Sequence, residues 1–312
     1  MVHYDLSNNN TLIDEHYAGL KDAILDKIEK SGIKISLKNF LKTNLLAILT
    51  SQPKDIYPLS TKFNRLNLPR DKNKIKQINA IFNYANFIIK DKDKYCAYKL
   101  AEKLGVRTCL YCNRNYTLTV IDNDIEDVKK RFITRPEFDH FFDKKTHPIL
   151  ALSIYNLIPS CKICNSSLKG KIHFNLKNNF HPYIDNYIND YQYKYKPLSY
   201  ESLVGGSSEV ELTLTSLTPD KNISTKINKH AKIFKLNEIM TMHSEEFKDL
   251  FEIRNKYSER YLDIICDTYS HLGLSYSEAY KMAFGVFIEE VKFNVRPFSK
   301  IKNDLLKQLD LI

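Results

Sequence analysis

The chain has 312 residues, 43% of them hydrophobic and 27% charged, a composition that excludes an intrinsically disordered protein. No stretch has the roughly 20 apolar residues that a membrane-spanning helix needs. Residues 1–16 lack the basic region and apolar run of a signal peptide, so we expect a cytoplasmic protein. Lysine and arginine number 47 against 37 aspartates and glutamates, and this net charge of +10 favours a polyanionic partner such as nucleic acid.

The first hundred or so residues have the apolar spacing of helices. One helix is predicted around residues 17–28 and a second over 37–48, with Ser36 as its cap. Two prolines within 51–60 are expected to interrupt the helical run. Further helices are predicted over 74–89 and 95–105, the last closed by its C-terminal glycine. We therefore expect residues 1–105 to form a helical N-terminal region.

Strand signals begin beyond residue 106. Residues 115–122 have the composition of a strand, and residues 128–142 suggest a second extended passage. A helix is then expected to begin near Cys164. These short elements predict a small mixed core over residues 106–185, between two helical regions.

Residues 186–312 are predicted to hold short strands followed by helices. Apolar side chains alternate along residues 210–214, which indicates a half-buried strand. Tyrosine and lysine alternate along residues 191–196, a pattern more typical of an edge strand with one solvated face than of a surface that stacks on nucleic-acid bases. Helical spacing then returns, with Ser275 and Glu278 as a capping box.

Four of the six cysteines form two Cys-x-x-Cys pairs, Cys109 with Cys112 and Cys161 with Cys164. Tetrahedral zinc takes four thiolates, so in a cytosolic chain this spacing predicts a shared structural zinc site rather than disulfides. Reduced structural thiols or a redox pair are the alternatives, although a redox motif is expected singly and in a thioredoxin-like context. The pairs are 49 positions apart (161 minus 112), so zinc would join the two ends of an inserted element.

The inserted element carries groups suited to phosphodiester hydrolysis, which needs a deprotonated water and a cation that neutralises phosphate charge. His140 could accept the proton of the water, while Asp139 and Asn165 offer oxygen ligands to Mg²⁺ or Mn²⁺. Lys169, one helical turn beyond Asn165, could contact a substrate phosphate, and His181 is a further candidate contact. Taken singly, each residue has an ordinary alternative role, such as a surface turn or a solvated charge.

The order Asp139-His140, Asn156, Asn165, closed by the second cysteine pair, resembles the HNH (ββα-metal) endonuclease family, in a subgroup that carries zinc knuckles. The intervals of 16 (156 minus 140) and 9 (165 minus 156) positions suit a loop that returns to a second strand and then enters a helix. The resemblance implies that Asn156 holds the loop and orients His140. Adjacent strand residues point to opposite faces, so Asp139 and His140 can converge only where the strand ends or twists.

Within this family the layout looks most like the PtuB-type nucleases of Septu and related retron antiphage systems. This closer resemblance implies a role in antiphage defence beside an ATPase partner of the ABC/SMC-like type. A restriction or homing-type HNH enzyme is the alternative.

The expected fold is α+β, with a zinc-clipped ββα-metal core embedded in a mainly helical protein. The expected function is that of a metal-dependent endonuclease, with DNA favoured over RNA as substrate. One alternative is a zinc-stabilised nucleic-acid-binding or adaptor protein, which would not need His140. Another is a nuclease that acts on RNA such as tRNA. The predicted site residues act on the phosphate, which DNA and RNA share, and the sequence shows no element that would read bases.

Overall fold

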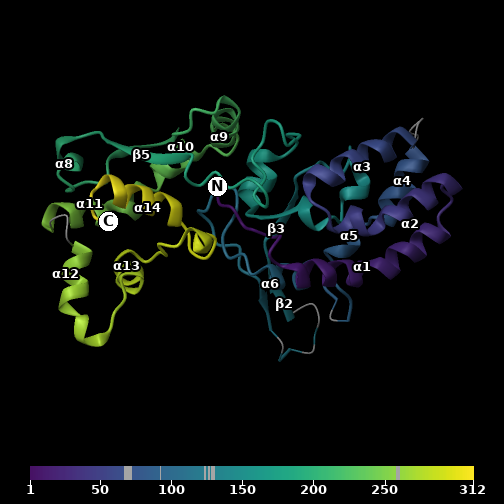
Figure 1. Ribbon diagram of the computed structural model, residues 1–312, viewed down its shortest axis with the longest axis horizontal. Coiled ribbons are helices and arrows are strands. Elements are labelled where there is room, and N and C mark those ends of the chain that lie inside the picture. The colour runs from purple at the N-terminus through teal and green to yellow at the C-terminus, as the bar shows by residue number, and fades with distance from the viewer. Residues whose placement is uncertain (67–71, 92, 123, 126, 128–130, 258–260) are drawn as a thin grey trace.

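The computed structural model describes residues 1–66, 72–91, 93–122, 124–125, 127, 131–257 and 261–312. The molecule is elongated, with the N-terminal helices at one end, the C-terminal elements at the other and strand β3 between them (Figure 1). Most regular structure is helical, and the strands in the described residues pair into three two-stranded sheets. The mainly helical α+β composition is thus confirmed. None of the described helices is long and apolar enough to cross a membrane.

The N-terminal region is built from helices whose apolar faces turn inward. The Asn9 side chain caps α1 by accepting a hydrogen bond from the Leu12 N–H, and Ile24 and Ile28 are buried on one face of that helix. Gly105 ends α6 in the left-handed conformation (φ 62°), as predicted. The helices are α1 (Asn10–Lys30), α2 (Ile35–Thr50), α3 (Pro53–Leu66), α4 (Lys72–Ile81), α5 (Tyr84–Phe87) and α6 (Ala97–Leu104).

Three details of the N-terminal prediction are wrong. Ser36 is not a cap, because α2 already begins at Ile35. Pro53 starts α3, where the N–H that proline lacks would have no intrahelical partner anyway, and Pro58 lies inside the same helix. The helix predicted over 74–89 is divided into α4 and α5, because Asn83 caps the second of them.

The middle region contains two small antiparallel sheets and a short π-helix. Of residues 115–122, only Val120–Ile121 form a strand. The pair β3–β4 has Glu137 opposite Ser160 and His140 opposite Leu157, and the helix η3 follows β4 almost at once. The elements are β1 (Val120–Ile121), β2 (Phe132–Thr134), β3 (Glu137–His140), η1 (Pro148–Leu150), η2 (Ile154–Asn156), β4 (Leu157–Ser160) and η3 (Ile163–Lys169).

The C-terminal region confirms the strand and capping predictions. Strand β5 pairs with β6, and Tyr191 and Tyr193 of β5 are buried, so their rings are not available for base stacking. The capping box of Ser275 and Glu278 is present. The elements are β5 (Tyr191–Pro197), α8 (Tyr200–Leu203), β6 (Val210–Ser216), α9 (Lys221–Ile233), α10 (Leu236–Met242), η4 (Ser244–Phe247), α11 (Lys248–Lys256), α12 (Tyr261–Thr268), η5 (Ser270–Leu272), α13 (Tyr276–Phe284), η6 (Glu290–Lys292) and α14 (Ser299–Gln308).

Three buried histidines form hydrogen bonds with distant backbone carbonyls, and two of these bonds join different regions. His16 of α1 bonds the Leu152 carbonyl, and the ring nitrogen Nε2 lies 2.8 Å from the oxygen. His181 bonds the Tyr155 carbonyl at 3.1 Å, and His230 of α9 bonds the Tyr111 carbonyl at 2.9 Å. A carbonyl oxygen only accepts, so each Nε2 carries the proton. Burial lowers the pKa of His16 to about 4 and the pKa values of His181 and His230 to about 3.

Mild acid is expected to destabilise the protein because of these three histidines. Their folded pKa values lie below the value of about 6.5 for an unfolded chain, so the unfolded state binds more protons as the pH falls. The contribution of each histidine is complete above about pH 6.5 and is lost at about 1.4 kcal/mol per pH unit below it. Urea unfolding at pH 7, 6 and 5 should show a steep fall in the free energy of unfolding. An unchanged midpoint across this range would contradict the burial of neutral imidazoles.

Candidate metal centre and catalytic site

The two Cys-x-x-Cys pairs meet in the interior. The sulfur atoms of the four residues lie within 4.8 Å of one another, and all four side chains are buried. In a tetrahedral zinc site with Zn–S bonds of about 2.3 Å, the sulfurs lie about 3.8 Å apart, so this spacing suits one ion. Among the described residues, no other group of three or more His, Cys, Asp or Glu side chains is close enough to hold a metal. The cluster of Cys109, Cys112, Cys161 and Cys164 could therefore hold a structural zinc.

Backbone hydrogen bonds hold each cysteine pair in position. The first pair lies in a turn closed by a 2.8 Å hydrogen bond from the Asn113 N–H to the Cys109 carbonyl, and Asn113 adopts a left-handed conformation with φ 52°. The Asn113 amide also donates to the Phe293 carbonyl at 2.7 Å, which anchors the turn to the C-terminal region. The second pair lies where β4 passes into η3, and the Asn165 N–H donates to the Cys161 carbonyl at 3.0 Å. The other two cysteines lie outside the cluster: Cys96 is buried and Cys266 packs against the core.

Strands β3 and β4 and helix η3 bring four of the predicted site residues to one cavity. This cavity has a volume of about 400 Å³, and Asp139, His140, Asn165 and Lys169 all line it. His140 is the last residue of β3, so the strand ends where the two adjacent side chains need to converge. The arrangement of two antiparallel strands followed by a helix is the one that the spacing predicted.

The carboxylate of Asp139 is buried and has partners on both oxygens. Oδ2 accepts a 2.6 Å hydrogen bond from the Tyr111 hydroxyl, and burial raises the pKa of Tyr111, so the phenol stays protonated. Oδ1 accepts from the ammonium of Lys169 at 2.8 Å, and both side chains of this ion pair are 5% exposed. Lys169 also donates to the His140 carbonyl at 2.9 Å. A cation at Asp139 would therefore share the carboxylate with Lys169 or displace it.

Asn165 is held by a residue that the sequence analysis missed. Its amide nitrogen donates to Oε2 of Glu137 at 2.9 Å, and the Ser166 hydroxyl donates to the same oxygen at 3.1 Å. An amide that donates through Nδ2 keeps its Oδ1 for another partner. Glu137 could have been found from its position, because it precedes Asp139 by two residues and so shares a strand face with it. Glu137, Asp139 and Asn165 all carry oxygen atoms of the kind that hard divalent cations prefer, and all three line the same cavity.

His140 is oriented by the loop that joins the two strands. Its Nε2 lies 3.0 Å from the Ala151 carbonyl oxygen and must carry the proton, so the lone pair is on Nδ1. The ring of Tyr84 lies edge-on at 4.5 Å. Burial, with a smaller effect from the positive charge of Lys144, lowers the pKa of His140 to about 3. The imidazole is therefore neutral at pH 7.

Asn156 fixes the same loop from its other end. The side chain is fully buried, donates to the Phe142 carbonyl at 3.1 Å and to the Leu150 carbonyl at 2.9 Å, and accepts from the Phe142 N–H at 2.6 Å. All the hydrogen-bonding groups of the amide are thus used within the loop. This geometry is consistent with the role that the resemblance implies for Asn156.

His181, the second candidate for substrate contact, lies elsewhere. It is fully buried, Nε2 bonds the Tyr155 carbonyl, and Nδ1 accepts from the Tyr183 N–H at 3.3 Å. It does not line the cavity that holds Asp139 and His140. Both ring nitrogens of His181 are therefore used in hydrogen bonds to the backbone within the core.

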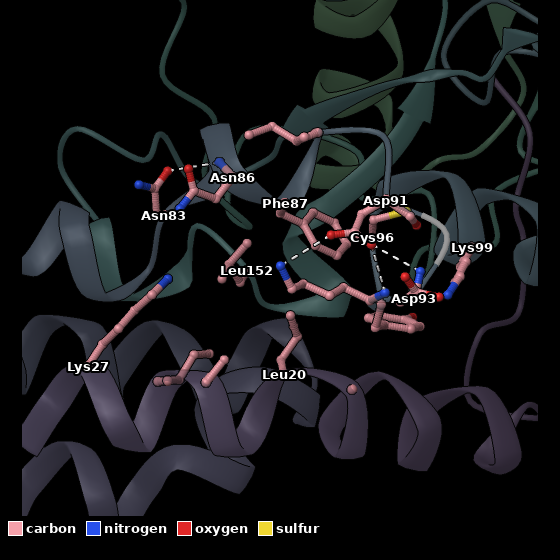
Figure 2. Close-up of a pocket in the computed structure, with 16 residues that line it drawn as sticks. Leu20, Lys27, Asn83, Asn86, Phe87, Asp91, Asp93, Cys96, Lys99 and Leu152 are labelled. Atoms are coloured by element: carbon pink, nitrogen blue, oxygen red, sulfur yellow. Dashed lines mark hydrogen bonds and ion pairs between the residues drawn. The ribbon is translucent and has the colours of Figure 1, made fainter. Parts of the chain in front are cut away.

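A second cavity, of about 800 Å³, lies between α1 and residues 83–99 (Figure 2). Its lining includes the apolar side chains of Leu20, Phe87 and Leu152, together with Lys27. None of the predicted site residues lines it. Leu152 nevertheless follows Ala151, whose carbonyl accepts the hydrogen bond from His140, so this cavity borders the loop that orients the imidazole.

The geometry of the cysteine cluster predicts how much zinc the protein contains. We expect one zinc per chain by elemental analysis, and Cys164→Ser should lose the zinc and the cooperative unfolding transition, because binding energy at such a site contributes directly to folding. Cys266→Ser, at a half-buried cysteine outside the cluster, should keep both properties. Zinc retained by Cys164→Ser would contradict a four-thiolate site.

The burial of the ion pair between Lys169 and Asp139 predicts how much its loss lowers the free energy of unfolding. Lys169→Met leaves the Asp139 carboxylate buried without its cation and should lower the free energy of unfolding by about 3–5 kcal/mol. The matched control is Lys30→Met, which breaks an exposed pair with Asp26 on α1 and should leave the urea midpoint unchanged. Equal effects of the two substitutions would show that the Lys169 pair is solvated.

Comparison with known proteins gives no assignment. No protein-family model, no curated protein and no solved structure matches this chain.

Proposed function

We propose that this chain is a metal-dependent endonuclease of the HNH type that hydrolyses phosphodiester bonds, with DNA as the favoured substrate. One observation carries the proposal. The hairpin of β3 and β4, followed by η3, gathers Asp139, His140 and Asn165 on one cavity, and the cysteine cluster lies at the β4–η3 junction. In this proposal zinc fills the cysteine cluster and is structural.

His140 is the general base in this scheme. Its Nε2–H is committed to the Ala151 carbonyl, so Nδ1 is the atom that takes a proton from the attacking water. The imidazole is neutral at pH 7, which keeps this lone pair available. As the proton arrives, the Ala151 carbonyl accepts a stronger hydrogen bond from the ring, because a charged donor binds a carbonyl more tightly than a neutral one.

Asp139 and Asn165, with Glu137 beside them, are the residues that would hold Mg²⁺ or Mn²⁺. When bound there, such an ion neutralises charge on the scissile phosphate and on the leaving oxygen. The ammonium of Lys169 lies between Asp139 and the His140 carbonyl. We propose that Lys169 contacts a substrate phosphate. His181 has no part in this scheme, because it is enclosed in the core.

A second function is favoured by one observation. Both oxygens of Asp139 are already bonded, by Tyr111 and Lys169, as they would be in a core that serves only structure. A zinc-stabilised nucleic-acid-binding protein with net charge +10 would have this feature. That protein would bind nucleic acid in a salt-dependent way and would be indifferent to His140.

The test incubates the purified protein with plasmid DNA and, in parallel, with total tRNA, in the presence of Mg²⁺, Mn²⁺ or EDTA. We expect cleavage that requires the metal and falls by about 10²–10⁴-fold in His140→Ala, the range for loss of a general base. His271→Ala, at an exposed histidine in η5, is the matched control and should cleave normally. Metal analysis of both variants verifies that the zinc is retained.

Binding without cleavage, equal in wild type and His140→Ala, would favour the nucleic-acid-binding protein. Cleavage of tRNA alone would assign RNA as the substrate. The antiphage role and the ABC/SMC-like ATPase partner enter the proposal through the resemblance, so the assay is repeated with such an ATPase added. Cleavage that appears only in its presence would support a nuclease that the partner activates.

A further inference from the structure

Three consecutive backbone carbonyls in the loop between β3 and β4 each accept a hydrogen bond from a side chain. Leu150 accepts from Asn156 at 2.9 Å, Ala151 from His140 at 3.0 Å, and Leu152 from His16 at 2.8 Å. We call the carbonyls of Leu150, Ala151 and Leu152 the carbonyl clamp. Two of the donors belong to the hairpin itself, whereas His16 belongs to α1 and is 136 positions away from its acceptor.

We propose that His16 is a positioning residue for the reaction at His140. By fixing the Leu152 carbonyl, it holds the neighbouring Ala151 carbonyl in the direction that keeps the proton on Nε2 of His140 and the lone pair on Nδ1. This inference rests on the proposed function, in which Nδ1 is the base. It assigns to the N-terminal helices a part in the chemistry as well as in packing.

Backbone geometry explains how a hydrogen bond at Leu152 can restrict the Ala151 carbonyl. Peptide units are planar, so two soft dihedral angles separate one carbonyl from the next. With the carbonyls on both sides anchored, by Asn156 at Leu150 and by His16 at Leu152, the peptide unit of Ala151 has little freedom to turn. Loss of the His16 hydrogen bond frees one of these two anchors.

His16 is itself held in one orientation. Its Nε2 donates to the Leu152 carbonyl, so its Nδ1 accepts from the Tyr95 hydroxyl, which lies 3.2 Å away. Burial raises the pKa of Tyr95, so the phenol keeps the proton that it donates. Tyr95 in turn packs against Gly19 of α1, where an added Cβ would lie 2.4 Å from the ring carbon Cγ. A glycine one turn along α1 thus permits the contact that orients His16.

The side chain of Leu152 is buried in the core but also borders a cavity. Its side chain borders the cavity of about 800 Å³ that Leu20 and Phe87 also line, and Figure 2 shows it beside Phe87 and above Leu20 of α1. A side chain beside a cavity has fewer neighbours on that side to hold it in place. Side-chain packing does not set the direction of a backbone carbonyl, whereas the hydrogen bond from His16 does so for Leu152.

The test compares His16→Leu, which removes the donor, with His16→Gln, which offers an amide donor instead. Ile28→Ala is the matched control, because it removes core packing from the same helix and leaves the carbonyl clamp intact. Steady-state kinetics on the cleaved nucleic acid should show kcat reduced by about 10–100-fold in His16→Leu with KM unchanged, the cost expected of a small misplacement. His16→Gln should recover most of this loss, and Ile28→Ala should keep the wild-type kcat.

A second measurement needs no activity. Protein labelled with ¹⁵N at histidine reports by NMR which ring nitrogen of His140 carries the proton, with the signal assigned by its absence from His140→Ala. We expect the Nε2–H form in the wild type and a mixture of tautomers in His16→Leu. Tyr95→Phe, which removes one hydroxyl, should give an intermediate result and decides the question if His16→Leu does not fold.

Folded His16→Leu with an unchanged His140 signal and unchanged kcat would overturn the inference, as would the same result for Tyr95→Phe. A loss of kcat in Ile28→Ala as large as in His16→Leu would also overturn it, because the effect would then be one of helix packing. A wild-type protein that cleaves neither DNA nor RNA, with or without the added ATPase, would refute the proposed function instead. The NMR comparison would still show whether His16 sets the tautomer of His140.

Discussion

The four-cysteine cluster is the constraint on which the rest of the structure depends. It joins a turn at residues 109–112 to the junction of β4 and η3, and Tyr111 of that turn reaches in three directions. The Tyr111 hydroxyl bonds Asp139, its carbonyl accepts from His230 of α9, and its ring stacks on Phe234 at 4.6 Å. The position of the cluster therefore sets the candidate site on one side and the C-terminal region on the other.

The candidate site is built from polar groups that the fold has withdrawn from water. Asp139, His140 and Lys169 are all buried, and each has a specific partner. Such groups are costly to bury alone, so the hydrogen bonds that satisfy them also fix their geometry. The resulting rigidity suits the proposed reaction, in which these groups would hold a water and a phosphate in one arrangement.

The local chemistry of the site could be predicted from the sequence, but its long-range partners could not. The cysteine pairs and the order of Asp139, His140 and Asn165 have fixed spacings, and spacing predicted that they would meet near one hairpin. Glu137 could have been predicted in the same way, because side chains two residues apart in a strand point to the same face. His16 and Tyr111 could not, because a hydrogen bond between residues that are distant in the sequence leaves no periodic signal in the chain. The prediction that the prolines of α3 interrupt the helical run was wrong, because the sequence alone does not distinguish a proline that starts a helix from one that ends it.

The π-helical winding of η3 places a requirement on chain length. The Gly170 N–H reaches back five residues to the Asn165 carbonyl, which is the closure of a π-turn. Such turns amount to one extra residue within an α-helix. Deleting a single residue between Asn165 and Lys169 would allow ordinary α-helical winding and would change the angle between the asparagine and the lysine around the helix axis by part of one residue step. Such a change would displace the ammonium from Oδ1 of Asp139, so a shortened segment would keep all the candidate site residues and still alter their alignment.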